Sequence, residues 1–250
     1  MPQNNKTTDF GYRHVSPDEK SSLVAEVFHS VANRYDLMND IMSFGLHRLW
    51  KRIAVSEANI RPGQFVLDVA SGTGDLVKMM AKEVGPSGKI VMTDINDSML
   101  AIGRDRLIDA GYLNNIVWMQ ADAEHLPFQD QYFDCITIAF GLRNVTDKTK
   151  ALTEFYRVLK PGGRLIILEF SQATSMVASK LYDLYSFHVI PQVGKMITKD
   201  KDSYQYLVES IRMHPHQSVL KAMMIDAHFE DVDYINLCNG IVAIHKGYKY

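Results

Sequence analysis

Residues 65–75 read Phe65-Val66-Leu67-Asp68-Val69-Ala70-Ser71-Gly72-Thr73-Gly74-Asp75, an apolar run that leads into a glycine-rich loop. A helical stretch follows, and a second apolar run, Lys89-Ile90-Val91-Met92-Thr93, ends in Asp94. A strand, a glycine-rich loop, a helix and a strand tipped with a carboxylate are typical of a nucleotide-binding βαβ unit, in which the final carboxylate accepts both ribose hydroxyls. The segment therefore predicts a nucleoside site at the carboxyl edge of a parallel sheet.

The charge of this loop narrows the class of ligand. Asp68 and Asp75 frame the loop, and no Lys or Arg lies between them. A loop that binds pyrophosphate offers backbone N–H groups and positive charge, because its ligand is anionic. Two carboxylates instead suit a nucleoside whose attached group is cationic. S-adenosylmethionine carries a sulfonium and an ammonium group, so the loop favours a methyltransferase.

Two other nucleotide-binding motifs are incomplete in this chain. The dinucleotide motif Gly-x-Gly-x-x-Gly has Gly72 and Gly74, but Val77 occupies the third place. The phosphate-binding Gly-Lys-Ser/Thr sequence does not occur. A plain tight turn, with glycines only for their positive φ, is the remaining alternative, and the three carboxylates around the loop disfavour it.

The composition is that of an ordinary globular protein. The chain has 250 residues, of which 46% are hydrophobic and 22% charged, and a net charge of −2 gives no bulk attraction for nucleic acid. Cys135 lies in an apolar run, which predicts a buried free thiol in a reducing compartment. The polar start, Met1–Asn5, lacks a signal-peptide apolar segment, and no run approaches the roughly 20 apolar residues of a membrane span. We expect a cytoplasmic protein.

Apolar runs alternate with helical patterns and turn residues along most of the chain. We expect strands at 65–69, 89–93, 116–120, 133–140, 164–169, 232–237 and 241–246, and helices from 18, within 38–53, and at 76–84, 97–110, 148–159 and 218–227. Because the runs are continuous, both faces of the sheet should be covered. The fold class is α/β, with a doubly wound, seven-stranded, mostly parallel Rossmann-like sheet.

Three regions are expected around this sheet. Residues 1–60 should form an N-terminal tail, frayed over its first seventeen residues, and a helical cap, and residues 61–250 the nucleotide-binding domain. An insertion at about 172–212 is rich in aromatic residues, including Tyr182, Tyr185, Phe187, Tyr204 and Tyr206. This insertion could act as a lid over an apolar ligand or could simply be core.

Long segments of the chain resemble a known family more closely than a fold pattern explains. They are Tyr35-Asp36-Leu37-Met38-Asn39-Asp40-Ile41-Met42-Ser43-Phe44-Gly45-Leu46-His47-Arg48-Leu49-Trp50, Phe140–Asp147, Arg157–Ser171 and Ser210–Pro215. These segments look like the signature segments of the ubiquinone/menaquinone biosynthesis C-methyltransferases. The resemblance implies a class I fold and transfer of a methyl group from S-adenosylmethionine to a ring carbon. It implies two conversions, demethylmenaquinol to menaquinol and a 2-polyprenyl-6-methoxy-1,4-benzoquinol to its C-methylated form.

The resemblance also implies cofactor contacts at Thr73, at Asp94 and at the pair Asp122-Ala123. It shows one departure, because a serine common in the family at the end of the fourth strand is Ala139 here, so a hydroxyl contact is lost or replaced by main chain. The residues themselves agree with these roles. Asp94 can accept the ribose hydroxyls, Asp122 the adenine amino group, and the Ala123 N–H can donate to a ring nitrogen. Asp68, Gly72 and Gly74 complete the predicted cofactor site.

The chemistry of the acceptor points to an arginine. A ring carbon becomes nucleophilic when the flanking hydroxyl ionises, so the protein should stabilise a phenolate-like oxygen and later accept the ring proton. Arg143, after the fourth strand, is the catalytic candidate for the first task, and an ion pair from Arg143 to Asp147 is the structural alternative. For the base, His47, His188, Asp147 and water stay open. Tyr35, Phe44 and Trp50 are expected to be core.

Two further patterns carry little weight. Tyr156 and Lys160 have the Tyr-x-x-x-Lys spacing of short-chain dehydrogenases, but that segment runs into Pro161-Gly162-Gly163, and we interpret it as fortuitous. The pair His214 and His216 lacks further ligands, so we expect no metal, and it should introduce the last helix. The expected partners are a prenylated quinol and a membrane surface at its inner face. Contact with other enzymes of quinone synthesis and a homodimer stay open.

Overall fold

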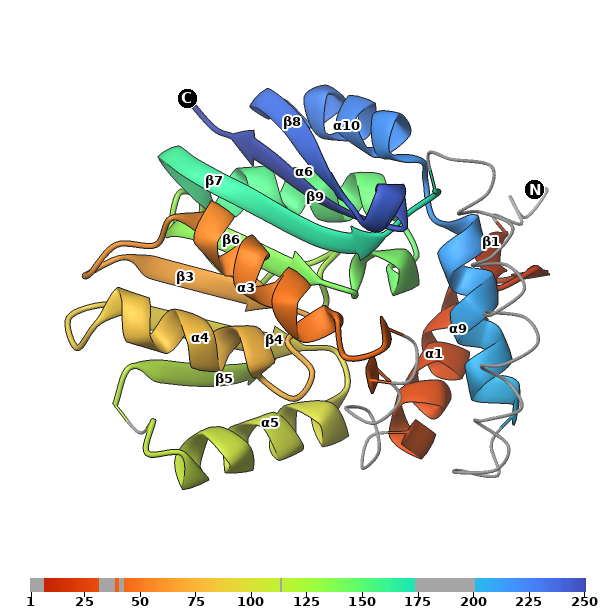
Figure 1. Ribbon diagram of the computed structural model, residues 1–250, viewed down its shortest axis with the longest axis horizontal. Coiled ribbons are helices and arrows are strands. Elements are labelled where there is room, and N and C mark those ends of the chain that lie inside the picture. Colours follow the sequence, from red (N-terminus) through yellow and green to blue (C-terminus); the bar gives the residue numbers. More distant parts are fainter. Residues whose placement is uncertain (1–6, 32–38, 41–42, 113, 174–200) are drawn as a thin grey trace, which may run out of the picture.

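The computed structural model describes residues 7–31, 39–40, 43–112, 114–173 and 201–250 (Figure 1). A seven-stranded sheet runs through the middle of these residues, and helices pack on both of its faces. The strands in chain order are β3 (Phe65–Val69), β4 (Lys89–Asp94), β5 (Ile116–Gln120), β6 (Phe133–Ala139), β7 (Leu159–Phe170), β8 (Glu230–Leu237) and β9 (Val242–Tyr248). The predicted seven-stranded α/β sheet is confirmed.

The strands lie in the order β5-β4-β3-β6-β7-β9-β8. The pairs from β5 to β7 are parallel, whereas β9 runs antiparallel to both of its neighbours. The chain winds outward from β3 in one direction and from β6 in the other. The two central strands therefore bound a switch point, and the loops that follow them diverge to leave a crevice.

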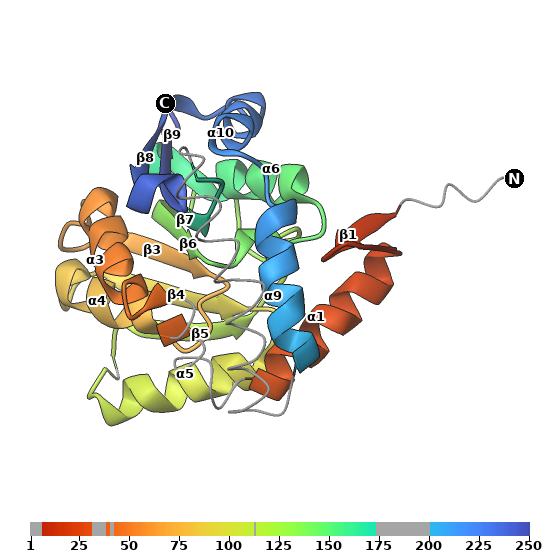
Figure 2. The same ribbon diagram turned by 45° about the vertical axis from the view of Figure 1, so that its right-hand side comes forward.

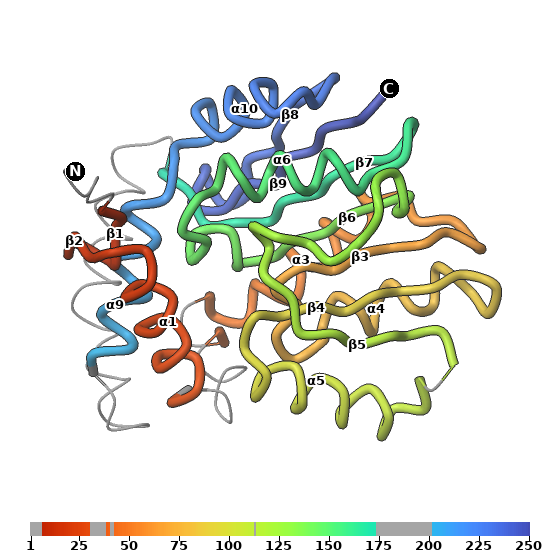
Figure 3. Tube along the Cα trace, turned by 180° about the vertical axis from the view of Figure 1, so that it is seen from behind, coloured from red at the N-terminus to blue at the C-terminus, as the bar shows by residue number. Residues whose placement is uncertain are grey.

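The helices form two layers (Figures 1 and 3). They are α3 (His47–Ala58), α4 (Asp75–Val84) and α5 (Asp97–Asp109) on one face and α6 (Lys148–Val158) and α10 (Gln217–Asp226) on the other. Val66 of β3 packs in the core under the first layer, and its neighbour Leu67 packs in the core under the second. Successive strand residues point to opposite faces, so a strand covered on both sides must be apolar throughout.

The helix α3 belongs to the main core. Trp50, Ala54 and Ala58 are at most 4% exposed and pack in the same cluster as Val66 and Ile166. We expected a boundary between an N-terminal region and the nucleotide-binding domain at residue 60. The segments on the two sides of this boundary share one core. Trp50 is core as predicted, whereas the expectation for Phe44 is wrong, because its side chain is 75% exposed. Tyr35 lies outside the described residues.

The N-terminal segment is more ordered than the sequence suggests. Strands β1 (Thr8–Phe10) and β2 (Arg13–Val15) form a hairpin before α1 (Pro17–Val31), so the expectation of a frayed start is wrong for these residues. Phe10 stacks on Tyr206 of α9 (Lys201–Met213) with ring centroids 4.2 Å apart, and the Tyr12 N–H donates to Glu209 at 3.1 Å. The hairpin gains its order from a helix some 200 residues away (Figure 2).

Part of the expected aromatic insertion is packed helix. Tyr204 and Tyr206 lie in α9 and are 0% and 4% exposed, and Tyr204 packs with Leu207 and Ile211 in the main core. Tyr182, Tyr185 and Phe187 lie outside the described residues. The described end of the insertion is therefore core.

The turn predicted at 160–163 lies inside a longer strand. β7 begins at Leu159, and Gly162 has a φ of +80°, which favours glycine. The Gly162 N–H donates to the Lys249 carbonyl at 2.6 Å, and the Lys249 N–H donates back to the Gly163 carbonyl at 3.0 Å. The C-terminal segment thus pairs with the turn and extends the strand, a contact that local sequence does not reveal.

Candidate functional site

A cavity of about 310 Å³ opens at the carboxyl edge of the sheet, where β3, β4, β5 and β6 end. Four of the predicted cofactor residues, Gly72, Asp94, Asp122 and Ala123, line it. Further lining residues come from α1 and from the loop after β6. We call this space the main cavity. Asp68, Thr73 and Gly74 do not line it.

Asp94 is fixed by backbone donors on both carboxylate oxygens. Its Oδ2 accepts the Gly72 N–H at 2.8 Å and its Oδ1 accepts the Asn96 N–H at 2.9 Å. The side chain is 8% exposed, and each oxygen retains a lone pair for a further donor. Burial raises the pKa of Asp94 to about 6, although the accepted N–H groups act to lower it. Asp94 is thus a rigid acceptor at the wall of the main cavity.

The turns after β3 and β6 have constrained backbones and approach each other closely. Ala70 has a φ of +50° and Phe140 a φ of +55°, values that cost energy for residues other than glycine. A Cβ on Gly141 would lie 2.5 Å from the Ala70 Cβ, so only glycine fits there. Ala70, Phe140 and Gly141 all line the main cavity. The strained turns meet where a ligand would lie.

Asp122 and Ala123 follow β5, which is the neighbour of β4 in the sheet. The Asp122 carboxylate accepts the Glu124 N–H at 2.9 Å and lies 3.4 Å from His125 Nδ1. Asp122 is half-buried and Ala123 is 9% exposed. These two residues and Asp94 face the same space, as expected for the carboxyl ends of adjacent parallel strands.

Helix α1 forms a wall of the main cavity that sequence reasoning missed. Its cavity-lining residues include Ser21, Val24, Ala25 and Phe28. The side-chain amide of Asn96 donates to the Ala25 carbonyl at 3.3 Å, while the Asn96 oxygen caps α5. No local signal marks this contact, because it joins segments 71 residues apart.

The acidic frame of the loop is neutralised in the fold. Asp75 Oδ2 lies 2.8 Å from Nζ of Lys51, a buried residue of α3, and Asp75 Oδ1 lies 3.7 Å from Arg106. Burial acts to raise the pKa of Asp75, but these two cations outweigh it and hold the pKa below its usual value. The sequence argument that Asp75 selects a cationic ligand is therefore not supported.

Asp68 is buried beneath the loop. Its Oδ1 accepts the Thr137 hydroxyl at 2.5 Å, and the side chain does not line the main cavity. Burial raises the pKa of Asp68 to about 6. Among the described residues that line the main cavity, four are carboxylates, namely Asp18, Asp94, Asp122 and Glu124, and none is Lys or Arg. The negative charge that faces a ligand thus comes from these residues and not from the frame of the loop.

Thr73 and Gly74 shape the loop. Thr73 is 6% exposed, and the Gly74 N–H donates to the Ser71 carbonyl at 3.0 Å with a φ of +79°. A Cβ on Gly103 of α5 would lie only 2.7 Å from the Gly72 carbonyl oxygen, so glycine at this position lets the helix contact the loop. The loop is therefore held by its own turn hydrogen bond and by its contact with α5.

Arg143 lies in a short 3-10 helix (Leu142–Asn144) after β6 and is 5% exposed. Its Nη1 lies 3.0 Å from Glu169 Oε1 and also donates to the Phe140 carbonyl, and the Arg143 N–H donates to Glu169 Oε2 at 3.1 Å. The structural alternative that paired Arg143 with Asp147 is wrong for this reason. Asp147 instead caps α6 by accepting the Lys150 N–H at 3.0 Å.

The described base candidates occupy different places. His47 is buried, its Nε2 lies 2.9 Å from Asp40 Oδ1, and burial lowers its pKa. Asp147 is exposed and engaged as a helix cap. His188 lies outside the described residues. Neither His47 nor Asp147 lines the main cavity.

The two patterns that we discounted are structural. Helix α6 ends at Val158, and Lys160 lies in β7 with its Nζ 2.9 Å from Asp134, so Tyr156 and Lys160 do not share a helix. His216 caps α10, as expected, by accepting the Ser218 N–H. Among the described residues, no three potential ligands are grouped to hold a metal ion. None of the described helices is long and apolar enough to cross a membrane.

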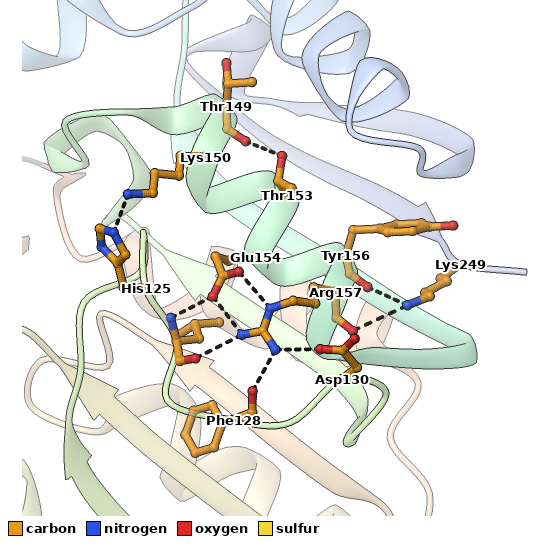
Figure 4. Close-up of polar contacts among 11 residues, drawn as sticks. His125, Phe128, Asp130, Thr149, Lys150, Thr153, Glu154, Tyr156, Arg157 and Lys249 are labelled. Carbon is orange, nitrogen blue, oxygen red and sulfur yellow. Dashed lines mark hydrogen bonds and ion pairs between the residues drawn. The ribbon is translucent and has the colours of Figure 1, made fainter.

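Arg157, in the signature segment 157–171, holds the loop that follows the cavity-lining residues 121–125 (Figure 4). Its Nε and Nη2 donate to the two oxygens of Glu154 at 2.7 and 2.8 Å, and Nη2 donates to the Leu126 carbonyl at 3.0 Å. Nη1 donates to the Phe128 carbonyl at 2.7 Å and to Asp130 at 2.8 Å. One guanidinium thus fixes residues 126–130, directly after the cavity-lining residues 121–125.

Comparisons with known proteins agree with this geometry. The model of the ubiE/COQ5 methyltransferase family matches residues 14–249. The chain is 58% identical over 248 residues to a Proteus mirabilis protein named ubiquinone/menaquinone biosynthesis C-methyltransferase UbiE, with 99% of each chain covered. The Escherichia coli O139:H28 protein of that name is 58% identical over 250 residues, with 100% of each chain covered.

Solved structures with the same fold are more distant in sequence. An S-adenosylmethionine-dependent methyltransferase from Aquifex aeolicus has a TM-score of 0.62 and 18% identity, covering 86% of this chain and 98% of that one. A Methanococcus maripaludis structure described as a putative S-adenosyl-L-methionine-dependent methyltransferase has a TM-score of 0.59 and 18% identity, covering 100% and 97%. The Rossmann-like class I fold is confirmed.

The predicted cofactor class is confirmed as well, since the protein is an S-adenosylmethionine-dependent methyltransferase. Its match spans nearly the full length of the chain and of its relatives. The chain belongs to the ubiE/COQ5 methyltransferase family.

Proposed function

We propose that the protein methylates a ring carbon of prenylated quinols in ubiquinone and menaquinone biosynthesis. The reactions are demethylmenaquinol to menaquinol and a 2-polyprenyl-6-methoxy-1,4-benzoquinol to its C-methylated form. The observation that carries the proposal is the 58% identity, over the full length of both chains, to proteins named for this role. The signature segments that first suggested the family all lie within the matched region.

The main cavity fits the cofactor by the chemistry of its walls. Asp94 offers two acceptor oxygens to ribose hydroxyls, and Gly72 lies against it. Asp122 and Ala123 line the same cavity. In this proposal the Asp122 carboxylate accepts from the adenine amino group, and the Ala123 N–H donates to a ring nitrogen. The four carboxylates among the described lining residues suit a cationic nucleoside. In this proposal Asp68, Thr73 and Gly74 support the loop from beneath.

When bound, S-adenosylmethionine supplies an electrophilic methyl group on a sulfonium. The task of the protein is then mainly to position the acceptor carbon and to exclude water. We place the acceptor beside Phe140, which lines the main cavity. The buried rings of Phe170 and Trp50 pack behind it, and the three ring centroids are 4.9 to 6.3 Å apart. An aromatic wall suits a quinol ring, and it also favours a nearby cation.

Arg143 remains the proposed catalytic residue. Its guanidinium lies 5.7 Å from the centroid of Phe170, and Glu169 holds it in one orientation. In this role the Arg143 guanidinium donates to the ring oxygen that becomes phenolate-like, while Glu169 fixes the orientation of the guanidinium. Arginine keeps its proton, so acceptance of the ring proton is left to another group or to water.

We propose peripheral contact with a membrane through an exposed apolar patch, defined as Phe44, Leu46 and Leu49. These side chains are 75%, 40% and 50% exposed at the start of α3. A lipid-soluble substrate requires access from the bilayer, and exposed apolar side chains favour an interface. Leu49→Gln should weaken sedimentation with phosphatidylcholine vesicles, whereas Arg61→Gln, at an exposed loop position, should not. Equal sedimentation of the wild type and Leu49→Gln would remove this patch from the proposal.

The proposed reaction is tested by mass spectrometry of quinones from cells that lack the protein. Demethylated precursors should accumulate, and the wild-type chain should remove them. An Asp94→Asn chain should fail to do so although it accumulates to a similar level. A normal quinone profile in the deleted strain would overturn the proposed substrate. It would leave the methyltransferase family assignment intact.

A further inference from the structure

A second, smaller pocket of about 90 Å³ lies beside the loop after β6. Residues of the N-terminal hairpin, α1, this loop, α6 and α9 line it. Its lining is mostly polar, and it includes Lys20, Lys148 and Arg143. We call it the lysine pocket. Thr146 lines both this pocket and the main cavity, so the two spaces share a wall.

Among the described residues, Lys20 and Lys148 share one hydrogen-bond acceptor. The Nζ of Lys20 donates to the Val145 carbonyl at 3.3 Å, and the Nζ of Lys148 donates to the same oxygen at 3.1 Å. Lys20 is 2% exposed and Lys148 is half-buried. Among the described residues, no carboxylate lies within ion-pair distance of either ammonium group. One carbonyl thus faces two cations.

Buried cations without a counter-ion are costly. Burial, and then the neighbouring Lys148, lower the pKa of Lys20 to about 8, while the more distant Asp9 and Glu124 act to raise it. Burial also lowers the pKa of Lys148, with Glu169 and Asp147 among the carboxylates that act to raise it. Burial thus disfavours the charged form of both ammonium groups, and an anion bound between them would favour it.

The nearby carboxylates are already engaged. Glu169 pairs with Arg143, and Glu124 accepts the backbone N–H groups of Thr146 and Asp147 at 3.0 and 2.9 Å. Asp9 lines the pocket, but its Oδ1 lies 3.0 Å from His14 Nδ1. Each carboxylate therefore has a partner other than the two lysines.

We propose that the lysine pocket binds a small tetrahedral oxyanion, a phosphate group, between the ammonium groups of Lys20 and Lys148. Thr8 and Thr146 line the pocket and can add hydroxyl donors. The phosphate is either free or the headgroup of an anionic lipid, since both present the same oxygens to the lysines. The site goes beyond quinol methylation, and its binding can be measured without quinol or cofactor.

The experiment is calorimetric titration of the full-length protein with inorganic phosphate. Lys148→Gln and Lys20→Gln should each weaken binding at least about tenfold, since each removes one charge-assisted donor. Asp9→Asn should tighten binding, because it removes a negative charge from the wall. Lys82→Gln, at an exposed position of α4, is the matched control and should bind as the wild type does. Phosphate should raise the Tm of the wild type and not of Lys148→Gln.

Vesicles distinguish the two sources of the phosphate group. If a lipid headgroup occupies the pocket, wild-type protein should sediment more with phosphatidic acid vesicles than with phosphatidylcholine vesicles. Inorganic phosphate and the Lys148→Gln substitution should each abolish this difference. If free phosphate is the ligand, wild type and Lys148→Gln should sediment equally while calorimetry separates them. Absence of phosphate binding, or equal binding by the wild type and both lysine variants, overturns the proposal. Weaker binding by Asp9→Asn, even where the lysine variants fail to fold, also overturns it.

Discussion

Arg143 and Glu169 form an ion pair with an Nη1–Oε1 distance of 3.0 Å, and each side chain is only 2% exposed. The two residues are 26 positions apart and come from the loop after β6 and the end of β7. Breaking such a pair leaves an uncompensated buried charge, which is strongly destabilising. Glu169 therefore fixes both the place and the orientation of the proposed catalytic arginine.

We expect Arg143→Lys to lower kcat by about a hundredfold, because an ammonium group cannot reproduce the planar donor fork at a developing oxyanion. The KM for S-adenosylmethionine should change much less, since Arg143 does not line the main cavity. Steady-state kinetics with a short-chain quinol separate the two parameters. Arg61→Lys, on an exposed loop, is the control, and an unchanged kcat in Arg143→Lys would refute the proposed role.

Asp94→Asn should weaken S-adenosylhomocysteine binding at least about tenfold. The amide nitrogen of Asn cannot accept a hydrogen bond, whereas both carboxylate oxygens of Asp94 can. The variant therefore loses one charge-assisted hydrogen bond, either to the ligand or to a backbone N–H of the loop. Calorimetry measures the affinity. Asp97→Asn, three residues on and exposed, should bind as the wild type does. If both variants bind equally well, Asp94 is not a cofactor contact.

Asp68 predicts a pH dependence of stability. Burial raises its pKa from 3.8 to about 6 in the folded protein, so between about pH 4 and pH 6 the folded state binds more protons than the unfolded state. This group therefore makes the free energy of unfolding fall as the pH rises through that window. Between pH 4.5 and pH 6.5, the free energy of unfolding measured with urea should fall less for Asp68→Asn than for the wild type. Parallel curves for the two proteins would contradict the raised pKa.

The ion pair of Lys51 and Asp75 should stabilise the glycine-rich loop. Lys51→Met should lower the free energy of unfolding by about 2 kcal/mol, less than for a fully buried pair because Arg106 still faces Asp75. A double-mutant cycle with Asp75→Asn, followed by urea unfolding, measures the coupling. Additive losses would mean that the two side chains do not interact in solution.

Arg157 should act on cofactor affinity as a positioning residue. Arg157→Lys cannot bond Glu154 in a bidentate way and reach the Leu126 and Phe128 carbonyls at the same time. We expect the KM for S-adenosylmethionine to rise about three- to tenfold, with kcat changed less than twofold, because loops 121–125 and 126–130 are continuous. A fall in kcat at constant KM would assign Arg157 a different role.

Much of this fold could be predicted from local sequence. The apolar runs ending at Val69 and Asp94 appear as strands with nearly the expected bounds, because side-chain periodicity and turn residues act within a few positions. Gly72, Asp94, Asp122 and Ala123 line one cavity because parallel strands end at a common edge. The class of fold and the grouping of these four residues at one edge of the sheet therefore followed from the sequence.

Only the tertiary structure decided which charges are paired and which face a ligand. Lys51 neutralises Asp75, and Arg143 pairs with Glu169 and not with Asp147, the partner in the structural alternative. The sequence revealed neither of these pairs. Lys20 and Lys148, 128 positions apart, meet at one carbonyl. Electrostatic partners are set by distance in space, and local sequence patterns hold no information about contacts between remote segments.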